Sequence, residues 1–543
     1  MEKVADALAR ALIEAGIDLV FGLPGGEVVA VLDAMRRKGI RFILAHNESS
    51  AVFMADAVAR LTGKPAACLT TLGPGAANAV AGAAHAYLDR SPALIITAQV
   101  PDRLHGRHTH QLVDLPALYA PITKGSFKLR PAGAAETVRA ALELARHGRP
   151  GPVHLQISNE DASQEALAGS PVEGPFPPLP ELSSAHDQPE RLVAARRLLT
   201  QARRPVIVAG LGLEPERPYE ALRALAEAAN APVITTPKGK GALPDDHPLA
   251  ADAIGLTRTD PIYALLDEAD CIVAIGFDVV ELVKPWDQVA PLIWVAPWTN
   301  EDPTLPAEVA FAGPMTPVLQ QLADSPFPPL GAQGGDWGGA RVATYRKELA
   351  QPALPPPAPG RLLPQTVMQA VRDNIPRETL VAVDVGSHKI LGALTWPTYA
   401  PNRFFVSNGL SCMGFALPAT IAASLVLPNE PIVCFTGDAG LAMVMGELGL
   451  LARLQTPVIV VVFNDSALDL IRSHQIRSGH PVYGTEFISP DFVGIAQAYG
   501  LQAYRVASEA ACAAAVQAAV AAGRPTLIEA MIDPVSYPTT PPG

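Results

Sequence analysis

Cysteine is scarce in this sequence of 543 residues. The five cysteines, Cys68, Cys271, Cys412, Cys434 and Cys512, are scattered and show no CxxC spacing. An odd and dispersed set of cysteines argues against a disulfide framework and against a zinc site. We therefore expect a protein of a reducing compartment, the cytoplasm.

Long apolar runs and blocks of like charge are also missing. The apolar stretch 456–463 is too short to cross a bilayer and predicts a buried strand. Residues 1–6 predict a charged amphipathic helix without the apolar core of a signal sequence. The net charge is −12, and Lys and Arg form no cluster. These features exclude the usual signs of a membrane or nucleic-acid partner, and we expect neither.

Apolar residues are abundant instead, at 49% of the sequence, which is enough for several large cores. Two stretches with many Pro and Gly residues, 164–188 and 324–364, predict linkers. They divide the chain into three domains, which we place at residues 1–165, 186–325 and 360–535.

Each of the three blocks alternates short β-branched runs with Ala- and Leu-rich amphipathic segments. The predicted strands include residues 67–71, 93–98, 205–209, 271–275, 379–383, 432–436 and 458–463. Such alternation is typical of parallel sheets with helices on both faces. The fold class we predict is therefore α/β, with three doubly wound parallel-sheet domains. Ligands of such sheets lie beyond the carboxyl ends of the strands.

The strongest motif follows the run 432–436. The segment 437–440, Gly-Asp-Ala-Gly, ends a strand and opens a helix, and the next apolar run ends at Asp465. Glycines let a ligand approach the backbone, and a helix N-terminus attracts phosphate. Two carboxylates on neighbouring strand ends can share Mg²⁺ with phosphate oxygens. A lone Gly-Asp-x-Gly is more often an ordinary turn, but the paired Asp465 favours a binding site.

This pair of motifs resembles the thiamine diphosphate (ThDP)-dependent enzymes, in which Gly-Asp-Gly is followed by Asn-Asn across the same interval. The resemblance implies ThDP as cofactor, with Mg²⁺ held by the side chains of Asp438 and Asp465 and by the carbonyl of Ala467. Two positions depart from the family pattern, Ala439 for glycine and Asp465 for asparagine. The extra carboxylate beside a diphosphate predicts a tighter dependence on the divalent ion.

The first block contains residues 41–48, a predicted strand ending in Glu48, followed by a predicted helix over 49–61. Taken alone, Glu48 could simply favour the dipole of that helix. However, its His-x-Glu-x-x-Ala pattern, together with segments 21–26 and 71–78, resembles the N-terminal domain of the family. The resemblance implies that Glu48 is the catalytic carboxyl group at the aminopyrimidine ring of ThDP. It also implies the cofactor-binding residues Gly25, Gly73 and Asn78.

The resemblance extends over the last block. Residues 384–388 are similar to the family's first diphosphate contact, and residues 407–414 to its turn under the pyrimidine ring. There Met413 would be the apolar wedge under the cofactor, although a methionine can equally be core packing. In this family two subunits share each active site, which implies a homodimer or homotetramer. The implied cofactor-binding residues of this block are Ser387, His388, Ser411, Met413, Gly437, Asp438, Ala439, Gly440 and Asp465.

Within the family the chain most resembles the acetolactate synthases, especially the catabolic, flavin-independent kind, over segments 92–101, 275–286 and 464–475. The resemblance implies decarboxylation of a 2-oxo acid such as pyruvate and ligation of the product to a second 2-oxo acid. His110 stands where these enzymes usually carry phenylalanine, and it could also be a surface residue. The implied site adds Gln111 as a catalytic residue and a substrate pocket of Gly26, Gln99, His110, Lys124 and Gln475.

Several alternatives stay open. Another ThDP enzyme would fit the same motifs: a 2-oxo acid decarboxylase, a sulfoacetaldehyde acetyltransferase or a 2-hydroxyacyl-CoA lyase. A non-catalytic relative is disfavoured by the joint presence of Glu48, Asp438 and Asp465. The segment 210–212, Gly-Leu-Gly, lacks the full dinucleotide motif and is weak evidence for FAD, so FAD in the central domain stays open, with its absence favoured. A role in branched-chain amino acid biosynthesis and a role in fermentation remain equally open.

Overall fold

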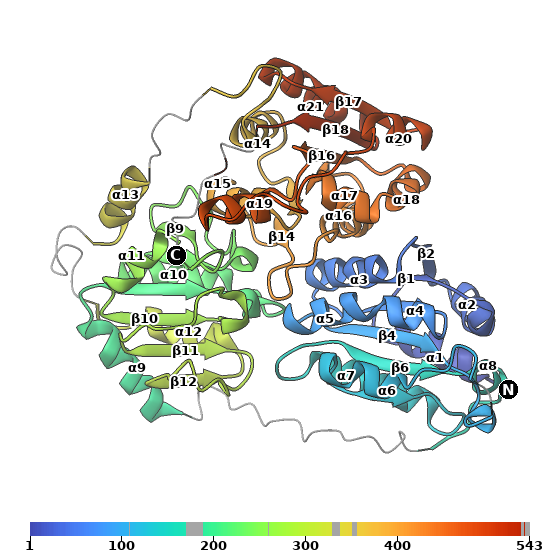
Figure 1. Ribbon diagram of the computed structural model, residues 1–543. Helices are drawn as coiled ribbons and strands as arrows, with labels where there is room; N and C mark the ends of the chain where they lie inside the picture. The colour runs from blue at the N-terminus through green and yellow to red at the C-terminus, as the bar shows by residue number, and fades with distance from the viewer. Residues whose placement is uncertain are drawn as a thin grey trace.

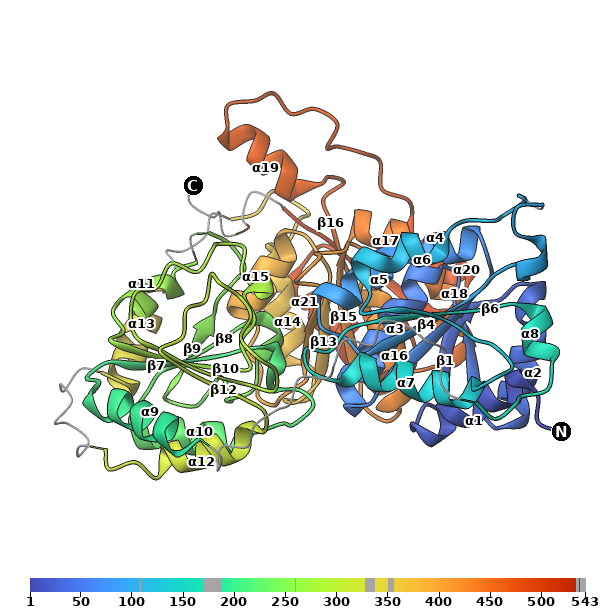
Figure 2. The ribbon, with the colours of Figure 1, turned by 90° about the horizontal axis from the view of Figure 1, so that it is seen from below.

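Three parallel sheets of six strands each form the framework of the chain (Figure 1). The computed structural model describes residues 1–107, 109–169, 188–258, 260–327, 337–349, 356–533 and 537. Helices cover the faces of each sheet, and the three layered units lie around a common junction (Figure 2). The predicted fold class, α/β with three parallel-sheet domains, is confirmed.

The N-terminal domain contains the first sheet, in the order β2-β1-β3-β4-β6-β5. Its strands are β1 (Leu19–Leu23), β2 (Arg41–Leu44), β3 (Ala66–Thr70), β4 (Ala93–Ala98), β5 (Ser126–Lys128) and β6 (Val153–Ile157). Its helices are α1 (Val4–Glu14), η1 (Gly26–Val28), α2 (Val29–Arg37), α3 (Glu48–Thr62), α4 (Pro74–Asn78), α5 (Val80–Leu88), η2 (Asp102–Leu104), α6 (Leu115–Tyr119), η3 (Ala120–Ile122), α7 (Ala134–Arg146) and α8 (Asn159–Ser163).

The central domain has a different strand order, β12-β11-β10-β7-β8-β9. This is the doubly wound arrangement, in which successive strands are added outward in one direction from the first strand and in the other direction from the fourth, here β7 and β10. Its strands are β7 (Pro205–Ala209), β8 (Val233–Thr235), β9 (Ala250–Ala253), β10 (Cys271–Ile275), β11 (Leu292–Ala296) and β12 (Val309–Ala312). Its helices are α9 (Pro189–Gln201), η5 (Leu211–Leu213), α10 (Tyr219–Ala229), η6 (Pro237–Gly239), α11 (Ile262–Asp267), η7 (Val279–Glu281), α12 (Met315–Ala323) and α13 (Gly339–Glu348).

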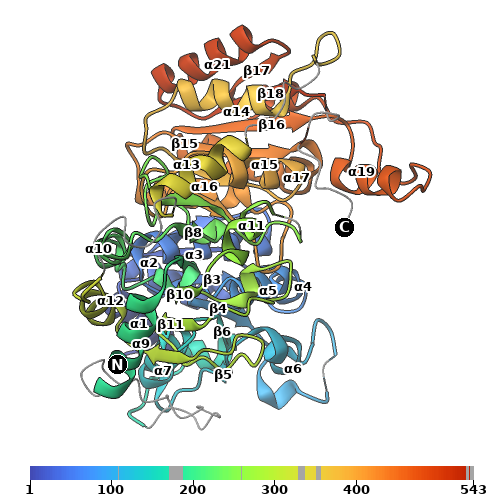
Figure 3. The same ribbon diagram turned by 90° about the vertical axis from the view of Figure 1, so that its left-hand side faces the viewer.

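The C-terminal domain repeats the topology of the first, with the order β14-β13-β15-β16-β18-β17. Its strands are β13 (Leu380–Val383), β14 (Phe404–Val406), β15 (Ile432–Gly437), β16 (Val458–Asn464), β17 (Gln502–Val506) and β18 (Thr526–Met531). Its helices are α14 (Pro364–Asp373), α15 (Ser387–Thr395), α16 (Ala416–Val426), α17 (Asp438–Val444), α18 (Glu447–Leu454), α19 (Asp469–Arg477), α20 (Phe492–Ala498) and α21 (Glu509–Ala522). We call residues 469–489 the α19 arm, because this segment stands away from the three domains (Figure 3).

The structure departs from the sequence prediction at two places. The predicted strand 41–48 ends at Leu44, and Glu48 is instead the first residue of α3. The second predicted linker contains α13, whose buried Tyr345 packs into the core of the central domain. Much of both linkers, residues 170–187, 328–336 and 350–355, lies outside the described residues.

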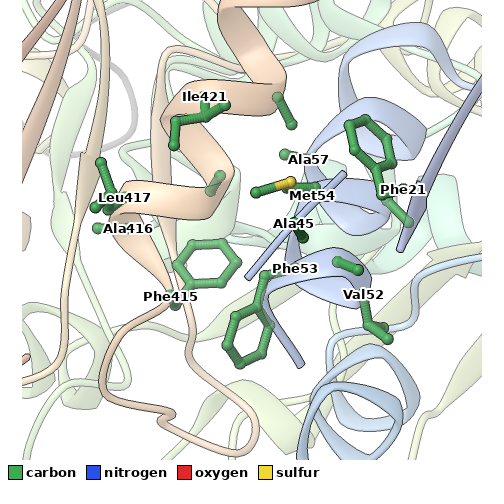
Figure 4. Packing of buried hydrophobic residues seen from close by; sticks show 14 of the residues in the cluster. Phe21, Ala45, Val52, Phe53, Met54, Ala57, Phe415, Ala416, Leu417 and Ile421 are labelled. Carbon is green, nitrogen blue, oxygen red and sulfur yellow. The ribbon is translucent and has the colours of Figure 1, made fainter. Parts of the chain in front are cut away.

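The N-terminal and C-terminal domains share one hydrophobic core, centred on α3 and α16 (Figure 4). Phe53 of α3 meets Phe415 edge to face, with ring centroids 5.6 Å apart. Alanines on both helices, such as Ala57 and Ala416, let the two backbones approach closely. This packing fixes the positions of the carboxyl ends of the two sheets relative to each other.

Two expectations from composition can be compared with the structure. Each of the five cysteines is a free thiol, so no disulfide framework is present among them. Among the described residues, none of the helices is long and apolar enough to cross a membrane.

Candidate active site

A cavity with about 650 Å³ of space free of protein atoms opens at the carboxyl ends of β13, β15 and β16. We call it the C-terminal cavity. Among the described residues, its lining comes entirely from the C-terminal domain. It brings together many of the residues predicted to bind cofactor or metal, namely Ser387, His388, Met413, Gly437, Asp438, Ala439, Gly440, Asp465 and Ala467.

Two predicted metal ligands meet at one side of this cavity. Asp438 opens α17 and is buried; its carboxylate accepts hydrogen bonds from the backbone N–H of Ser466 at 2.7 Å and from the hydroxyl of Ser489 at 2.8 Å. Asp465 follows β16 and accepts the N–H of Ala467 at 3.2 Å. A third carboxylate, Asp469 at the start of α19, accepts the hydroxyl of Ser387 at 3.1 Å.

Crowding of these carboxylates disfavours their charged forms. Burial raises the pKa of Asp465 to about 7, and the charges of Asp438 and Asp469 act in the same direction. Burial also raises the pKa of Asp438, against the hydrogen bond from Ser489. Within the described residues, no group of three or more His, Cys, Asp or Glu side chains could by itself hold a metal ion. A cation here would therefore need oxygens from a ligand as well as from the protein.

Two glycines at the floor of the cavity are required by close packing against other protein groups. A Cβ atom on Gly386 would lie 2.6 Å from the ring of His388, and one on Gly440 would lie 2.5 Å from the carboxylate of Asp384. His388 stacks on Phe463, and burial lowers its pKa to about 3. Its Nε2 is buried without a hydrogen-bond partner in the described residues. An unsatisfied nitrogen of this kind is suited to a polar ligand in the cavity.

Residues 407–414, which we call the Met413 turn, bring Met413 to the cavity after β14. The buried carboxylate of Asp384 accepts the N–H groups of Gly414 at 2.9 Å and Phe415 at 3.2 Å. Ser411 is exposed and has a left-handed backbone, with φ of 55°. The buried ammonium of Lys389 donates to its hydroxyl at 3.1 Å. The turn is thus held by side chains from β13 and α15.

The second group of predicted residues lies in the N-terminal domain, at the carboxyl edge of its sheet. Glu48 is buried at the start of α3, and the amide of Asn78 donates to its carboxylate at 3.3 Å. Asn47 caps this helix by accepting the N–H of Ser49 at 2.9 Å. Glu447 of the C-terminal domain accepts the N–H of Asn47 at 3.1 Å. The other domain of the same chain therefore fixes the loop that carries Glu48.

The segment 99–113 folds back over the same edge. Buried Gln99 follows β4 and donates to the carbonyl of Val113 at 2.9 Å. Gln111 lies against Gly73, because a Cβ atom on Gly73 would be only 2.8 Å from the Cβ of Gln111. Both backbones are left-handed here, with φ of 55° and 57°. The remaining predicted residues of this edge are Gly25, Gly26 and His110, of which Gly26 and His110 are exposed.

Lys124 lies neither at the C-terminal cavity nor among the predicted residues around Glu48. It precedes β5, at the amino edge of the sheet, and its ammonium donates to the carbonyl of His147 at 2.5 Å. Burial lowers its pKa to about 8. Because ligands of parallel sheets lie at the carboxyl edge, we leave Lys124 out of the proposed site. Gln475 lies on the α19 arm, where its amide donates to the carbonyl of Tyr483 at 2.9 Å.

Sequence reasoning did not single out three side chains that line the C-terminal cavity or bond to residues that line it. Asp384 and Asp469 could have been found, because each is a carboxylate directly after a strand end or at a helix start, next to a chosen motif. Ser489 had no such signal, since it reaches Asp438 from the far end of the α19 arm.

Comparison with known proteins agrees with this geometry. Three family models match the chain: the N-terminal thiamine pyrophosphate-binding domain over residues 2–118, the central domain over residues 192–322, and the C-terminal thiamine pyrophosphate-binding domain over residues 384–530. The chain belongs to the thiamine pyrophosphate enzymes. It is therefore an enzyme. The C-terminal cavity lies in one matched cofactor-binding domain. The carboxyl edge of the N-terminal sheet around Glu48, which we call the Glu48 edge, lies in the other.

Similar proteins cover the whole chain. It is 31% identical to the probable acetolactate synthase large subunit of Methanocaldococcus jannaschii, over 100% of this chain and 94% of that protein. It is 32% identical to the acetolactate synthase large subunit of Parasynechococcus marenigrum, over 99% and 89%. It is also 32% identical to the isozyme 1 large subunit of Escherichia coli K12, over 99% and 96%. The chain is thus an acetolactate synthase-like member of its family.

The C-terminal cavity fits the diphosphate half of the cofactor. Gly386 and Gly440 let the floor pack closely on His388 and Asp384, and His388 offers an unsatisfied Nε2. Asp438 and Asp465 supply the carboxylate oxygens that Mg²⁺ prefers when it also binds phosphate oxygens.

Proposed function

We propose that this enzyme is an acetolactate synthase, which decarboxylates pyruvate and joins the two-carbon product to a second 2-oxo acid. The observation that carries the proposal is the C-terminal cavity with its paired carboxylates, in a chain similar over its whole length to acetolactate synthase large subunits. When bound, ThDP would supply a nucleophilic carbon for the substrate carbonyl and a cationic thiazolium ring as the sink for the electron pair left by carbon dioxide.

The chain's own residues would bind and orient the cofactor. Asp438, Asp465 and the carbonyl of Ala467 would hold Mg²⁺ against the diphosphate. Glu48 would hold a proton at a ring nitrogen of the aminopyrimidine; its burial at a helix start keeps water from that contact. The further cofactor contacts we propose are Gly25, Gly73, Asn78, Ser387, His388, Ser411, Met413, Gly437, Ala439 and Gly440.

The substrate would lie between the Glu48 edge and the C-terminal cavity. Gln111 would contact the reacting groups, because it sits against Gly73 at the Glu48 edge. Gln99 shapes the same loop through its bond to Val113. The substrate-pocket residues that we retain are Gly26, Gln99, His110 and Gln475.

A second copy of the chain would complete each site. The described lining of the C-terminal cavity includes no residue of the N-terminal domain, and Glu48 bonds within its own domain. Beside the cavity, the α19 arm exposes Tyr483 at 85% and Ile488 at 96% of their surfaces. Large apolar side chains exposed at this level suit an interface. A homodimer or homotetramer would therefore pair the Glu48 edge of one subunit with the cavity of another.

Product analysis tests the reaction. Purified protein with ThDP, Mg²⁺ and pyruvate should form acetolactate in step with pyruvate loss. Replacement of Glu48 by Gln should lower turnover by at least about a hundredfold while ThDP still binds. If pyruvate is untouched while ThDP binds, the reaction proposed here is wrong and other 2-oxo acids and acyl-CoA substrates come next.

Complementation tests the shared site. The Glu48→Gln and Asp438→Asn variants should each be inactive. When they are co-expressed, a mixed dimer would have one site with both changes and one site with neither. Recovery of part of the wild-type activity is therefore expected, and no recovery from a stable mixed dimer would show that each chain forms its site alone.

We also propose that the activity needs no flavin. A dinucleotide would bind at the crevice between β7 and β10. There the carboxylate of Glu281 accepts the N–H of Leu211 at 2.9 Å, and the ring of Trp298 packs on Gly212. An acidic side chain thus holds a backbone N–H that a phosphate group would need. Added FAD should leave turnover unchanged, and any FAD-dependent rise would contradict the proposal.

A further inference from the structure

The Met413 turn is held from outside its own domain as well as from within. Its first residue, Ser407, is fully buried, and its hydroxyl accepts the N–H of Cys412 at 2.9 Å across the turn. The same hydroxyl lies 3.0 Å from Nδ1 of His85, which belongs to α5 of the N-terminal domain. The turn that presents Met413 to the cavity therefore depends on a side chain more than three hundred positions away in sequence.

His85 is itself fixed on both sides. It is completely buried, and its ring packs against Phe53 and Phe415 at centroid distances of 5.1 Å and 4.9 Å. Its Nε2 lies 3.1 Å from the carboxylate of Asp56 on α3. Burial alone would raise the pKa of Asp56, but the charge of Lys238 and the contact with His85 hold it well below its usual range. Asp56 therefore stays ionised and orients the ring.

A second contact runs from the end of α5 to the same turn. Asp89 caps this helix, and its Oδ1 accepts the N–H of Gly409 at 2.7 Å. Its Oδ2 lies 3.1 Å from Nδ1 of His85 and 3.0 Å from the ammonium of Lys238, a residue of the central domain. A Cβ atom on Gly409 would lie only 2.7 Å from that of Leu88, so the turn rests directly on α5.

This buried polar cluster joins all three domains at the base of the Met413 turn. Buried ionic groups are weak contributors to stability, because removing charges from water costs about as much as their pairing returns. Their value can instead lie in fixing one geometry. Here the geometry fixed is that of the turn, since Ser407 and Gly409 are its contact points.

We propose that Asp56, His85 and Asp89 are positioning residues, by which the N-terminal domain holds the Met413 turn against the cofactor bound in the C-terminal cavity of the same chain. The inference rests on the proposed function, because it takes Met413 to contact ThDP. None of the three residues lines the C-terminal cavity, and they act through Ser407 and Gly409.

Cofactor affinity is the measurement that tests it. Ser407→Ala removes the hydroxyl between His85 and the N–H of Cys412 and leaves every charge in place. His85→Phe removes both ring nitrogens and keeps a ring packed against Phe53 and Phe415. Each variant should raise the dissociation constant for ThDP with Mg²⁺ by about tenfold, which is the effect of one lost buried hydrogen bond. Calorimetry on the full-length protein measures this constant. The KM for pyruvate should change much less.

Matched variants separate positioning from plain stability. Asn402→Gly breaks another contact between the three domains, since Asn402 bonds to Arg60 and Glu214, but it does not touch the turn. It should lower the midpoint of thermal unfolding and leave ThDP affinity unchanged. Asp89→Asn keeps an acceptor for the N–H of Gly409 and should retain more affinity than Asp89→Ala, although both remove the partner of Lys238.

The outcomes are distinguishable. If Ser407→Ala and His85→Phe lower thermal stability but bind ThDP as the wild type does, the cluster only joins the domains and the proposal is wrong. If the wild type binds no ThDP at all, the proposed function fails and this inference falls with it. If the wild type binds ThDP but ignores pyruvate, only the reaction is wrong, and the affinities of the variants still decide the inference.

Discussion

Asp465, which stands where the pattern resembled in the sequence has asparagine, adds a carboxylate to the proposed metal site. Its carboxylate adds a charge beside Asp438 and Asp469, where the charged forms already disfavour one another. In the proposed site, Mg²⁺ would have to offset that charge as well as that of the diphosphate. We expect the wild type to lose ThDP and activity on dialysis against a chelator. Asp465→Asn should retain ThDP better without Mg²⁺, by roughly tenfold in its dissociation constant, because one negative charge is gone.

Calorimetric titration of ThDP with and without Mg²⁺ checks this. Asp491→Asn is a suitable control, because Asp491 pairs with Arg505 away from the cavity and should respond like the wild type. A wild type that keeps its cofactor firmly bound and fully active after chelation would show that the extra carboxylate does not increase the metal requirement.

At the residue scale, the sequence singled out mainly side chains that directly follow a strand. Asp438, Asp465 and Gln99 lie at carboxyl ends, where parallel sheets collect their ligands. Ser489 and His85 act through tertiary contacts that no local pattern announces. Lys124 shows the opposite error: its neighbourhood in sequence resembled the family, but it precedes its strand and so lies at the other edge.

At the scale of elements, the loops after β7 and β10 are joined by one buried carboxyl group. Burial raises the pKa of Glu281 to about 7 from 4.5, against the charge of Lys238. Between these two pH values the folded chain keeps a proton that the unfolded chain has released. The stability contributed by this group is therefore complete below pH 4.5 and is lost as the pH rises to about 7.

Glu281→Gln should remove this pH dependence and keep an acceptor for the N–H of Leu211. At pH 8 we expect the variant to be more stable than the wild type by up to about 3 kcal/mol, and at pH 4.5 nearly equal to it. Thermal unfolding followed at both pH values measures the difference. An equal gain at both would mean that the effect comes from packing and not from the proton.

The elements themselves were largely readable from the sequence. The predicted strands 93–98, 205–209 and 271–275 coincide with β4, β7 and β10, because continuous β-branched runs are buried on both faces of a parallel sheet. Helix α13 was missed because it is short and has Pro- and Gly-rich sequence on both sides. Only its contacts with the central domain, such as Tyr345 in that core, show why it is a helix.

At the scale of the whole molecule, the exposed apolar α19 arm bears on assembly. If a second copy covers it, Ile488→Asp should weaken the dimer, raising its dissociation constant by about tenfold or more, because a charge would be buried in the interface. Val289→Asp is the matched control, since Val289 is 99% exposed on the central domain. Sedimentation over a range of protein concentrations checks this, and an unchanged dissociation constant for Ile488→Asp would place the interface elsewhere.

The close packing of α3 against α16 affects how rigid the molecule is. Small side chains, mainly alanine, alternate there with a few large ones, and close-packed atoms leave little free volume to compress. In each chain the N-terminal and C-terminal domains therefore form one stiff block. Any movement that admits substrate would then have to come from outside this block, for example from the α19 arm, which stands away from the three domains.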